Sequence, residues 1–194
     1  MKKRVLLLTA GLIAATFMYS SCSKESTTTT VTPTANPTLY ERVGGTTLVN
    51  DPSNAGKMIE KGRLTLRAVV DSSIFVIAAD PQMAKYFPVL FAELGMSNTT
   101  GLTALSKNFT DFMCSATGSK NTAYAYTGKS MKAAHDPAQH NRIAVKIDKA
   151  DFDKFVGNIG AGLAQNGVTS ANNKALVDDL VALLYTTQGD IVQK

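Results

Sequence analysis

The sequence predicts an all-α domain over residues 39–194, preceded by an export segment and a polar linker. Apolar residues in this part recur at three- and four-residue steps, the period of a helix that packs one face on a core. One short apolar alternation, over residues 143–147, has no second strand with which to pair, so we expect an extended segment there. The composition, 44% hydrophobic and 18% charged over 194 residues, is that of a globular protein with one core.

Residues 1–21 have the layout of a secretory signal peptide. Basic residues at positions 2–4 precede an apolar run over 5–19, which is short for a membrane span. Two serines then precede Cys22, an arrangement that resembles a bacterial lipobox, although Tyr19 stands where that motif usually has an aliphatic residue. Two alternatives follow: Cys22 carries a lipid that anchors the protein to a membrane, or a plain secretory signal is cleaved.

Residues 22–38 are rich in threonine, contain two prolines and have almost no hydrophobic side chains, so we expect a solvated linker. If Cys22 is acylated, Cys114 has no disulfide partner. The formal charge of +5 comes from 20 basic and 15 acidic residues. Removing the basic residues at positions 2–4 leaves 17 against 15, or +2, and no basic cluster with interleaved aromatic residues remains. Nucleic acid is therefore not an expected partner.

The first long helix is predicted over residues 66–79, where the sequence is apolar on nearly every face, and it ends before Pro81. Such a helix is expected to be buried between others. The region before it, residues 49–62, is rich in Asp, Asn, Pro and Gly. We expect a long loop there, with one helical turn at 57–61.

Three further helices are predicted from apolar stripes. Asp148, with Asp151 three residues later, is typical of a helix start, and Gly167 of the end of the same helix. The C-terminal helix is expected to run to about residue 192. In chain order the stripes are Leu102, Leu105, Phe109, Phe112, Met113 and Ala116; Phe152, Phe155, Val156, Ile159 and Leu163; and Leu176, Leu180, Leu183 and Leu184.

The usual catalytic signatures are missing from the sequence. It has no phosphate-binding glycine loop, no CxxC, no HExxH, no EF-hand loop and no G-x-S-x-G turn. A zinc site would need His135 and His140 to combine with Cys114 and a carboxylate at arbitrary spacing. A hydrolase or a structural zinc protein therefore has little support.

One histidine has an informative setting. Met131 and His135 are four residues apart and share one face of a short predicted helix. Upstream, Asn108 falls within the apolar stripe of Leu105 and Phe112. One imidazole opposite an apolar wall that holds a single amide suits a haem iron, and the second ring nitrogen can bond the carbonyl of Met131. Without further information, an ordinary surface histidine remains the alternative.

Several short runs, in order, resemble the truncated haemoglobins of group I. The likeness extends over about residues 39–192 and implies a globin-like two-over-two helical sandwich, here with an inserted loop after the first helix. The runs are LYERVGG at 39–45, VVD at 69–71, AD at 79–80, YF at 86–87, DFMCSATG at 111–118, YTG at 126–128, SMKAAH at 130–135 and DFDKF at 151–155.

The resemblance implies that the chain binds haem b and that His135 is the proximal iron ligand. Phe87 would pack on the haem face and Lys132 would pair with a propionate. The other implied pocket residues are Leu105, Asn108 and Phe112 on the distal helix and Met131 on the proximal side, while Ile143 and Phe152 either line the pocket edge or fill the core.

The departures from the family pattern concern the distal pocket and the ligand. Ile74 occupies the place where the family usually has a tyrosine that donates a hydrogen bond to the diatomic ligand. Such a bond contributes about 1.5–3 kcal/mol, so its loss disfavours dioxygenase chemistry unless Asn108, where many relatives have Gln, compensates. Residues 49–62 and the stretch between His135 and Phe152 are insertions. The second contains His140, a competing candidate ligand that Pro137 separates from the helical face of His135.

The expected function is therefore that of an exported, lipid-anchored, haem b-binding globin at the cell envelope, which takes oxygen or nitric oxide. A ligand-binding protein is favoured over a turnover enzyme. Two alternatives are a haem-free globin-fold interaction module, which Ile74 favours, and a surface lipoprotein that scavenges haem.

Overall fold

The computed structural model describes residues 36–194. The predicted signal peptide, Cys22 and the linker up to residue 35 lie outside the described residues. A search of residues 36–194 finds no helix long and apolar enough to span a membrane. Cys114 is a free cysteine whose side chain is fully buried.

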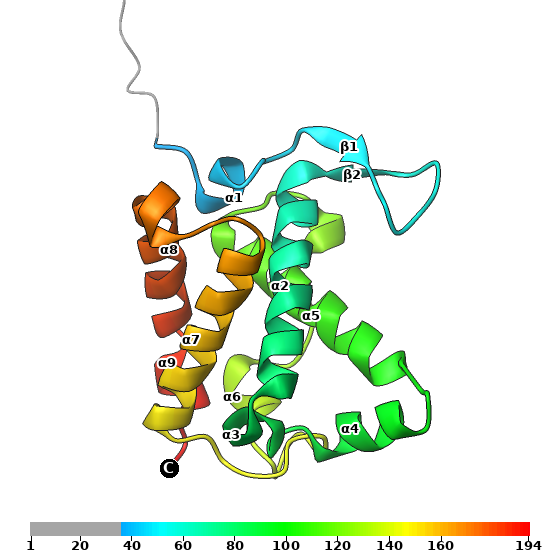
Figure 1. Ribbon diagram of the computed structural model, residues 1–194, viewed down its shortest axis with the longest axis vertical. Helices are drawn as coiled ribbons and strands as arrows, with labels where there is room; N and C mark the ends of the chain where they lie inside the picture. Colours follow the sequence, from blue (N-terminus) through cyan, green and yellow to red (C-terminus); the bar gives the residue numbers. More distant parts are fainter. Residues whose placement is uncertain (1–35) are drawn as a thin grey trace, which may run out of the picture. The chain divides into compact units, whose positions relative to one another are not determined.

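The described chain is helical apart from one small hairpin and its connecting loops (Figure 1). The elements are α1 (Leu39–Arg42), β1 (Leu48–Asn50), β2 (Met58–Glu60), α2 (Lys61–Ala79), α3 (Pro81–Ala84), α4 (Pro88–Gly95), α5 (Thr100–Thr117), the 3-10 helix η1 (Thr122–Tyr124), α6 (Met131–Ala134), α7 (Lys149–Gln165), α8 (Ser170–Tyr185) and α9 (Gln188–Ile191).

Two helix pairs make the core, α2 with α5 and α7 with α8, and α2 makes its most extensive contacts with α7. The two helices approach closely at Gly162 of α7 and Ser73 of α2. A Cβ atom at position 162 would lie 2.9 Å from the backbone nitrogen of Ser73 and still closer to its Oγ. Ser73 is fully buried and donates its hydroxyl to the carbonyl of Val69 at 2.7 Å, which satisfies this polar group at the interface. The glycine is therefore required by the packing distance between α2 and α7.

The predicted helices are confirmed, and their ends follow the signals in the sequence. Asp148 caps α7 by accepting a hydrogen bond from the amide of Asp151 at 2.9 Å, and Gly167 follows the helix with a positive φ of 75°. The C-terminal helix, predicted to continue to about 192, instead ends at Tyr185, and α9 is a separate turn. The hydroxyls of Thr186 and Thr187 donate to the carbonyls of the third residue before each. These bonds satisfy carbonyls that a continuing helix would use.

The prediction of a loop with one helical turn over 49–62 is wrong, because an antiparallel hairpin lies there. Leu48 pairs with Glu60 and Asn50 with Met58. Asp51 closes the connection by accepting hydrogen bonds from the backbone of Ser53 at 2.9 Å and from the Asn54 amide at 2.8 Å. The turn-forming residues that indicated a loop are thus those that join the two strands.

The extended segment predicted at 143–147 is present. Ile147 forms an isolated parallel bridge with Val192, and the amide of Gln193 donates to the carbonyl of Ile147 at 2.9 Å. This single bridge ties the loop before α7 to the C-terminus.

Candidate functional site

His135 ends the short helix α6. Ser130 begins this helix and accepts a hydrogen bond from the amide of Ala133 at 3.2 Å. His135 is the C-cap residue, with φ −111° and ψ 6°. Its Nδ1 lies 2.8 Å from the carbonyl oxygen of Met131, the bond that the four-residue spacing predicts. A ring held in this way has a fixed orientation.

The electrostatic setting of His135 favours the neutral ring. Burial lowers its pKa below the ordinary 6.5, and the nearby His140 lowers it further, against an opposing effect of the Met131 carbonyl. At pH 7 the neutral ring therefore carries its proton on Nδ1, which donates it to Met131. Nε2 has no hydrogen-bond partner among the described residues, so its lone pair is available to a metal.

The ring of His140 is also oriented by a hydrogen bond to a backbone carbonyl, but it lies on a loop. Its Nδ1 lies 2.8 Å from the carbonyl oxygen of Ala134, and the ring is half-buried. The loop that carries it is a tight turn in which the carbonyl of Asp136 accepts from the amides of Gln139 and His140, at 2.9 and 2.8 Å. His135 is attached to a helix and His140 to a loop, but both present an unbonded Nε2 within the described chain.

Half-buried apolar side chains from α5, α6, α7 and the corner before α4 pack against the edge of the core. Rings from α5 and α7 meet: Phe109 and Phe155 have centroids 6.1 Å apart, and Phe155 lies 6.3 Å from Phe152. We call His135 together with these side chains the His135 site, as the name of a predicted pocket. The half-buried members are Phe87, Leu102, Leu105, Phe109, Phe112, Met131 and Phe155.

The predicted pocket residues differ in exposure. Phe87, Leu105, Phe112 and Met131 are half-buried and pack against the core, and their role as a pocket wall stays a prediction. Ile143 and Phe152, placed at the pocket edge by the resemblance, are buried, with 8% and 1% of their surface exposed.

Three further predicted residues occupy different environments. Ile74 is buried in the core of α2, whereas Lys132 and Asn108 are exposed. Asn108 therefore differs from the apolar residues around it in the sequence, because Leu105 and Phe112 pack against the core and Asn108 does not. Its predicted distal role, like that of Ile74, stays a prediction.

Residue-by-residue reasoning assigned no site role to Leu102, Phe109 and Phe155. All three belong to the apolar stripes of α5 and α7, so the signal was present in their spacing. What the spacing does not give is which members of a stripe remain half-buried. That depends on how the two helices are placed relative to α6.

A buried carboxylate fixes the corner that carries Phe87. Asp151, at 2% exposure, accepts hydrogen bonds from the phenol of Tyr86, from Gln82 Nε2 at 2.9 Å and from Lys85 Nζ at 3.2 Å. Burial alone would raise the pKa of Asp151, but these three donors outweigh it and lower the pKa to about 2. The corner after α2 is thereby held against the start of α7.

Metal binding by protein ligands alone finds no support in residues 36–194. No group of three or more His, Cys, Asp and Glu side chains there is placed to hold a metal ion. The combination of His135, His140 and Cys114 considered from the sequence is therefore not assembled. A metal at the His135 site would need ligands from a cofactor.

No protein-family model matches the sequence, and no curated protein matches it. The fold, however, is that of the truncated, two-over-two haemoglobins. The truncated haemoglobin of Tetrahymena pyriformis in its Fe(III) form is similar at a TM-score of 0.53 and 22% identity, covering 81% of this chain and 100% of that one. A point mutant of it gives a TM-score of 0.56 with the same identity and coverage. The 2/2 haemoglobin of Synechococcus sp. PCC 7002, solved in the cyanomet state with covalently attached haem, gives 0.52 at 20% identity, covering 79% and 95%.

Proposed function

We propose that this protein is a haem b-binding globin of the cell envelope that takes small diatomic ligands, with His135 as the iron ligand. One observation carries the proposal. In a truncated-haemoglobin fold, His135 is held by the Met131 carbonyl with its Nε2 left unbonded among the described residues. The envelope location rests on the layout of residues 1–22 and on lipid attachment at Cys22.

The residues grouped as the His135 site suit a planar apolar group. Haem needs one neutral imidazole, flat apolar walls and an outer edge where its propionates meet water or cations. His135 supplies the imidazole, and the half-buried rings of Phe109 and Phe155 supply part of the wall. Lys132, exposed on α6, is available to a propionate, and haem when bound supplies the iron that takes the diatomic ligand.

The distal residues favour weak, reversible ligand binding over dioxygenase chemistry. Ile74 is buried and offers no hydrogen-bond donor, and Asn108 is exposed. A missing donor of about 1.5–3 kcal/mol corresponds to roughly tenfold or more in ligand retention. The proposal is therefore a ligand-binding or sensing protein that binds oxygen or nitric oxide.

Haem titration tests the assignment of His135. Protein from residue 23 onward, mixed with hemin, is expected to give a sharp Soret band and, on reduction, a five-coordinate ferrous spectrum. His135→Ala should lose the band because the iron loses its ligand, whereas His140→Ala should keep it. The opposite pattern would assign the iron to His140.

A haem-free interaction module is the second candidate, and the same titration separates it. It is favoured by Ile74 and by the exposure of Asn108, since neither offers a donor inside a pocket. A folded protein that shows no Soret shift at micromolar hemin would support this second function. Helical circular dichroism measured on the same sample establishes that the protein is folded.

A further inference from the structure

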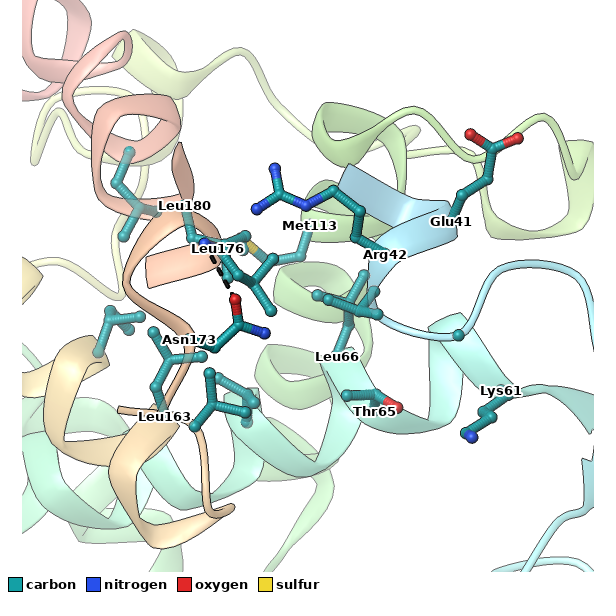
Figure 2. A pocket seen from close by; sticks show the side chains of 16 residues that line it. Glu41, Arg42, Lys61, Thr65, Leu66, Met113, Leu163, Asn173, Leu176 and Leu180 are labelled. Carbon is teal, nitrogen blue, oxygen red and sulfur yellow. Dashed lines mark hydrogen bonds between the residues drawn. The ribbon is translucent and has the colours of Figure 1, made fainter. Parts of the chain in front are cut away.

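A cavity of about 310 Å³ lies among α1, α2, α7 and α8 (Figure 2). None of its lining residues belongs to the His135 site. In Figure 1, α1 and α6 lie at opposite ends of α2, so the two sites are separated along this helix. We call this space the aliphatic cavity.

The inner wall of the cavity is aliphatic. An engineered apolar cavity of about 150 Å³ binds benzene, so twice that volume accommodates an apolar group of about twelve carbon atoms. The lining includes no aromatic ring from the described residues, which leaves no surface on which a flat ligand would stack. The wall therefore suits a flexible hydrocarbon chain. Its main members are Leu66, Met113, Leu163, Leu176, Leu180 and Leu184.

A break in α8 places a polar group at this cavity. Asn173 has a non-helical backbone, with φ −152° and ψ 60°. Its Oδ1 accepts a hydrogen bond from the amide of Leu176 at 3.4 Å and so caps the continuing helix. Figure 2 shows the side chain among the lining residues. Its Nδ2 donates to no described residue, so this amide is available to an acceptor in the cavity.

The remaining polar groups lie on the α1 side, and they are not equivalent. Arg42 is paired with Asp179 at 2.5 Å, and the Glu41 carboxylate accepts from the amide of Thr38 at 2.6 Å. Lys61 is exposed and forms no ion pair within the described chain, and Thr65 lies one turn further along α2. The groups left for a ligand are thus an ammonium, a hydroxyl and the Asn173 amide, and all of them can donate.

We propose that the aliphatic cavity binds a single-chain aliphatic carboxylate of about twelve carbons, with the chain inside and the carboxylate at Lys61. Apolar burial supplies most of the affinity. The ammonium of Lys61 selects a carboxylate over a neutral head group. This site is additional to the proposed haem function.

Calorimetry with dodecanoate tests the proposal, using protein from residue 23 onward, which retains the compact unit of residues 36–194. Micromolar binding with a stoichiometry near one is expected. Lys61→Glu should weaken dodecanoate binding about tenfold, the effect of losing roughly 1.4 kcal/mol, and leave dodecanol binding unchanged. Leu176→Phe, which fills the cavity, should weaken both ligands. Leu48→Phe, at an exposed hairpin position, is the matched control.

Two results would overturn the proposal. One is the absence of binding heat at dodecanoate concentrations up to about 100 μM, and the other is equal affinity of the wild type and Lys61→Glu for dodecanoate. Because Lys61 is exposed, its variant is expected to fold, so the test does not depend on Leu176→Phe being stable. His135→Ala should bind dodecanoate like the wild type. Failure of haem binding and failure of the aliphatic cavity are therefore observed separately.

Discussion

The His135 site and the aliphatic cavity adjoin the same core but differ in the side chains that line them. The His135 site takes its key group from α6, a helix of four residues, and its walls include half-buried aromatic rings. The aliphatic cavity is enclosed mainly by long helices and has leucines in place of rings. The difference teaches how lining selects ligand shape: the proposed ligands are a flat group at one end of α2 and a chain at the other. Both depend on the contact between α2 and α7.

The largest effect is expected from breaking that shared contact. Gly162→Val places branched carbons against the backbone and hydroxyl of Ser73, so α2 and α7 must separate. Overpacking of this kind costs about 3 kcal/mol in the free energy of unfolding, to be measured by urea denaturation. Haem and dodecanoate binding should weaken together.

Gly160 provides the control on the same helix. A Cβ atom at position 160 would meet nothing within 4 Å, so Gly160→Ala should stabilise the protein by up to about 1 kcal/mol through helix propensity. Equal stability of the two variants would show that the close approach at Gly162 does not limit the packing.

A smaller effect, confined to one end, is expected from Asp151→Ala. The change leaves the phenol of Tyr86 and the ammonium of Lys85 without their buried acceptor and should cost about 2 kcal/mol. The corner that carries Phe87 would loosen, so haem affinity should fall more than dodecanoate affinity. Titrations of both ligands at a temperature where the variant is folded measure this split, and an equal loss of both affinities would contradict it.

The same carboxylate predicts an acid dependence. Its pKa in the folded protein is about 2, below the ordinary 3.8 of the unfolded chain. The stability it contributes is therefore fully present above pH 3.8 and is lost as the pH falls through about 2. Asp153→Ala, on the exposed side of the same helix, is the control and should have a smaller effect.

The long helices were predictable because each buries a continuous apolar stripe whose period is visible without any partner. The hairpin was not, since its strands have three residues each and its turn is held from outside. Arg67 of α2 reaches Asp51 at 2.8 Å, and a contact over this sequence distance leaves no local pattern. The sequence did not indicate the break in α8 at Asn173 either, because the residues around Asn173 are typical of an ordinary helix start.

The candidate site likewise contains features that the sequence predicted and features that it did not. The bond from His135 to Met131 follows from a spacing of four residues on one helix, and the sequence predicts it. The bond from His140 to Ala134 depends on the turn at Asp136, and nothing in the spacing indicates it. The exposure of Asn108 was missed because helical spacing assigns a face only to within a residue or so.

The smallest expected effect separates the two histidines. Burial lowers the pKa of His135, so in haem-free protein its NMR titration should have a midpoint below 6.5, with His140→Ala used to assign the signal. The unfolded chain takes up the proton first as the pH falls. The neutral ring therefore contributes stability that is complete above pH 6.5 and declines between 6.5 and the lower folded pKa. Since a proton and iron compete for Nε2, haem binding should persist to a lower pH than a solvent-exposed imidazole would allow. A midpoint at or above 6.5 would mean that the ring is solvated, and the distinction between a desolvated, ring-lined end and an ordinary histidine at the surface would then be lost.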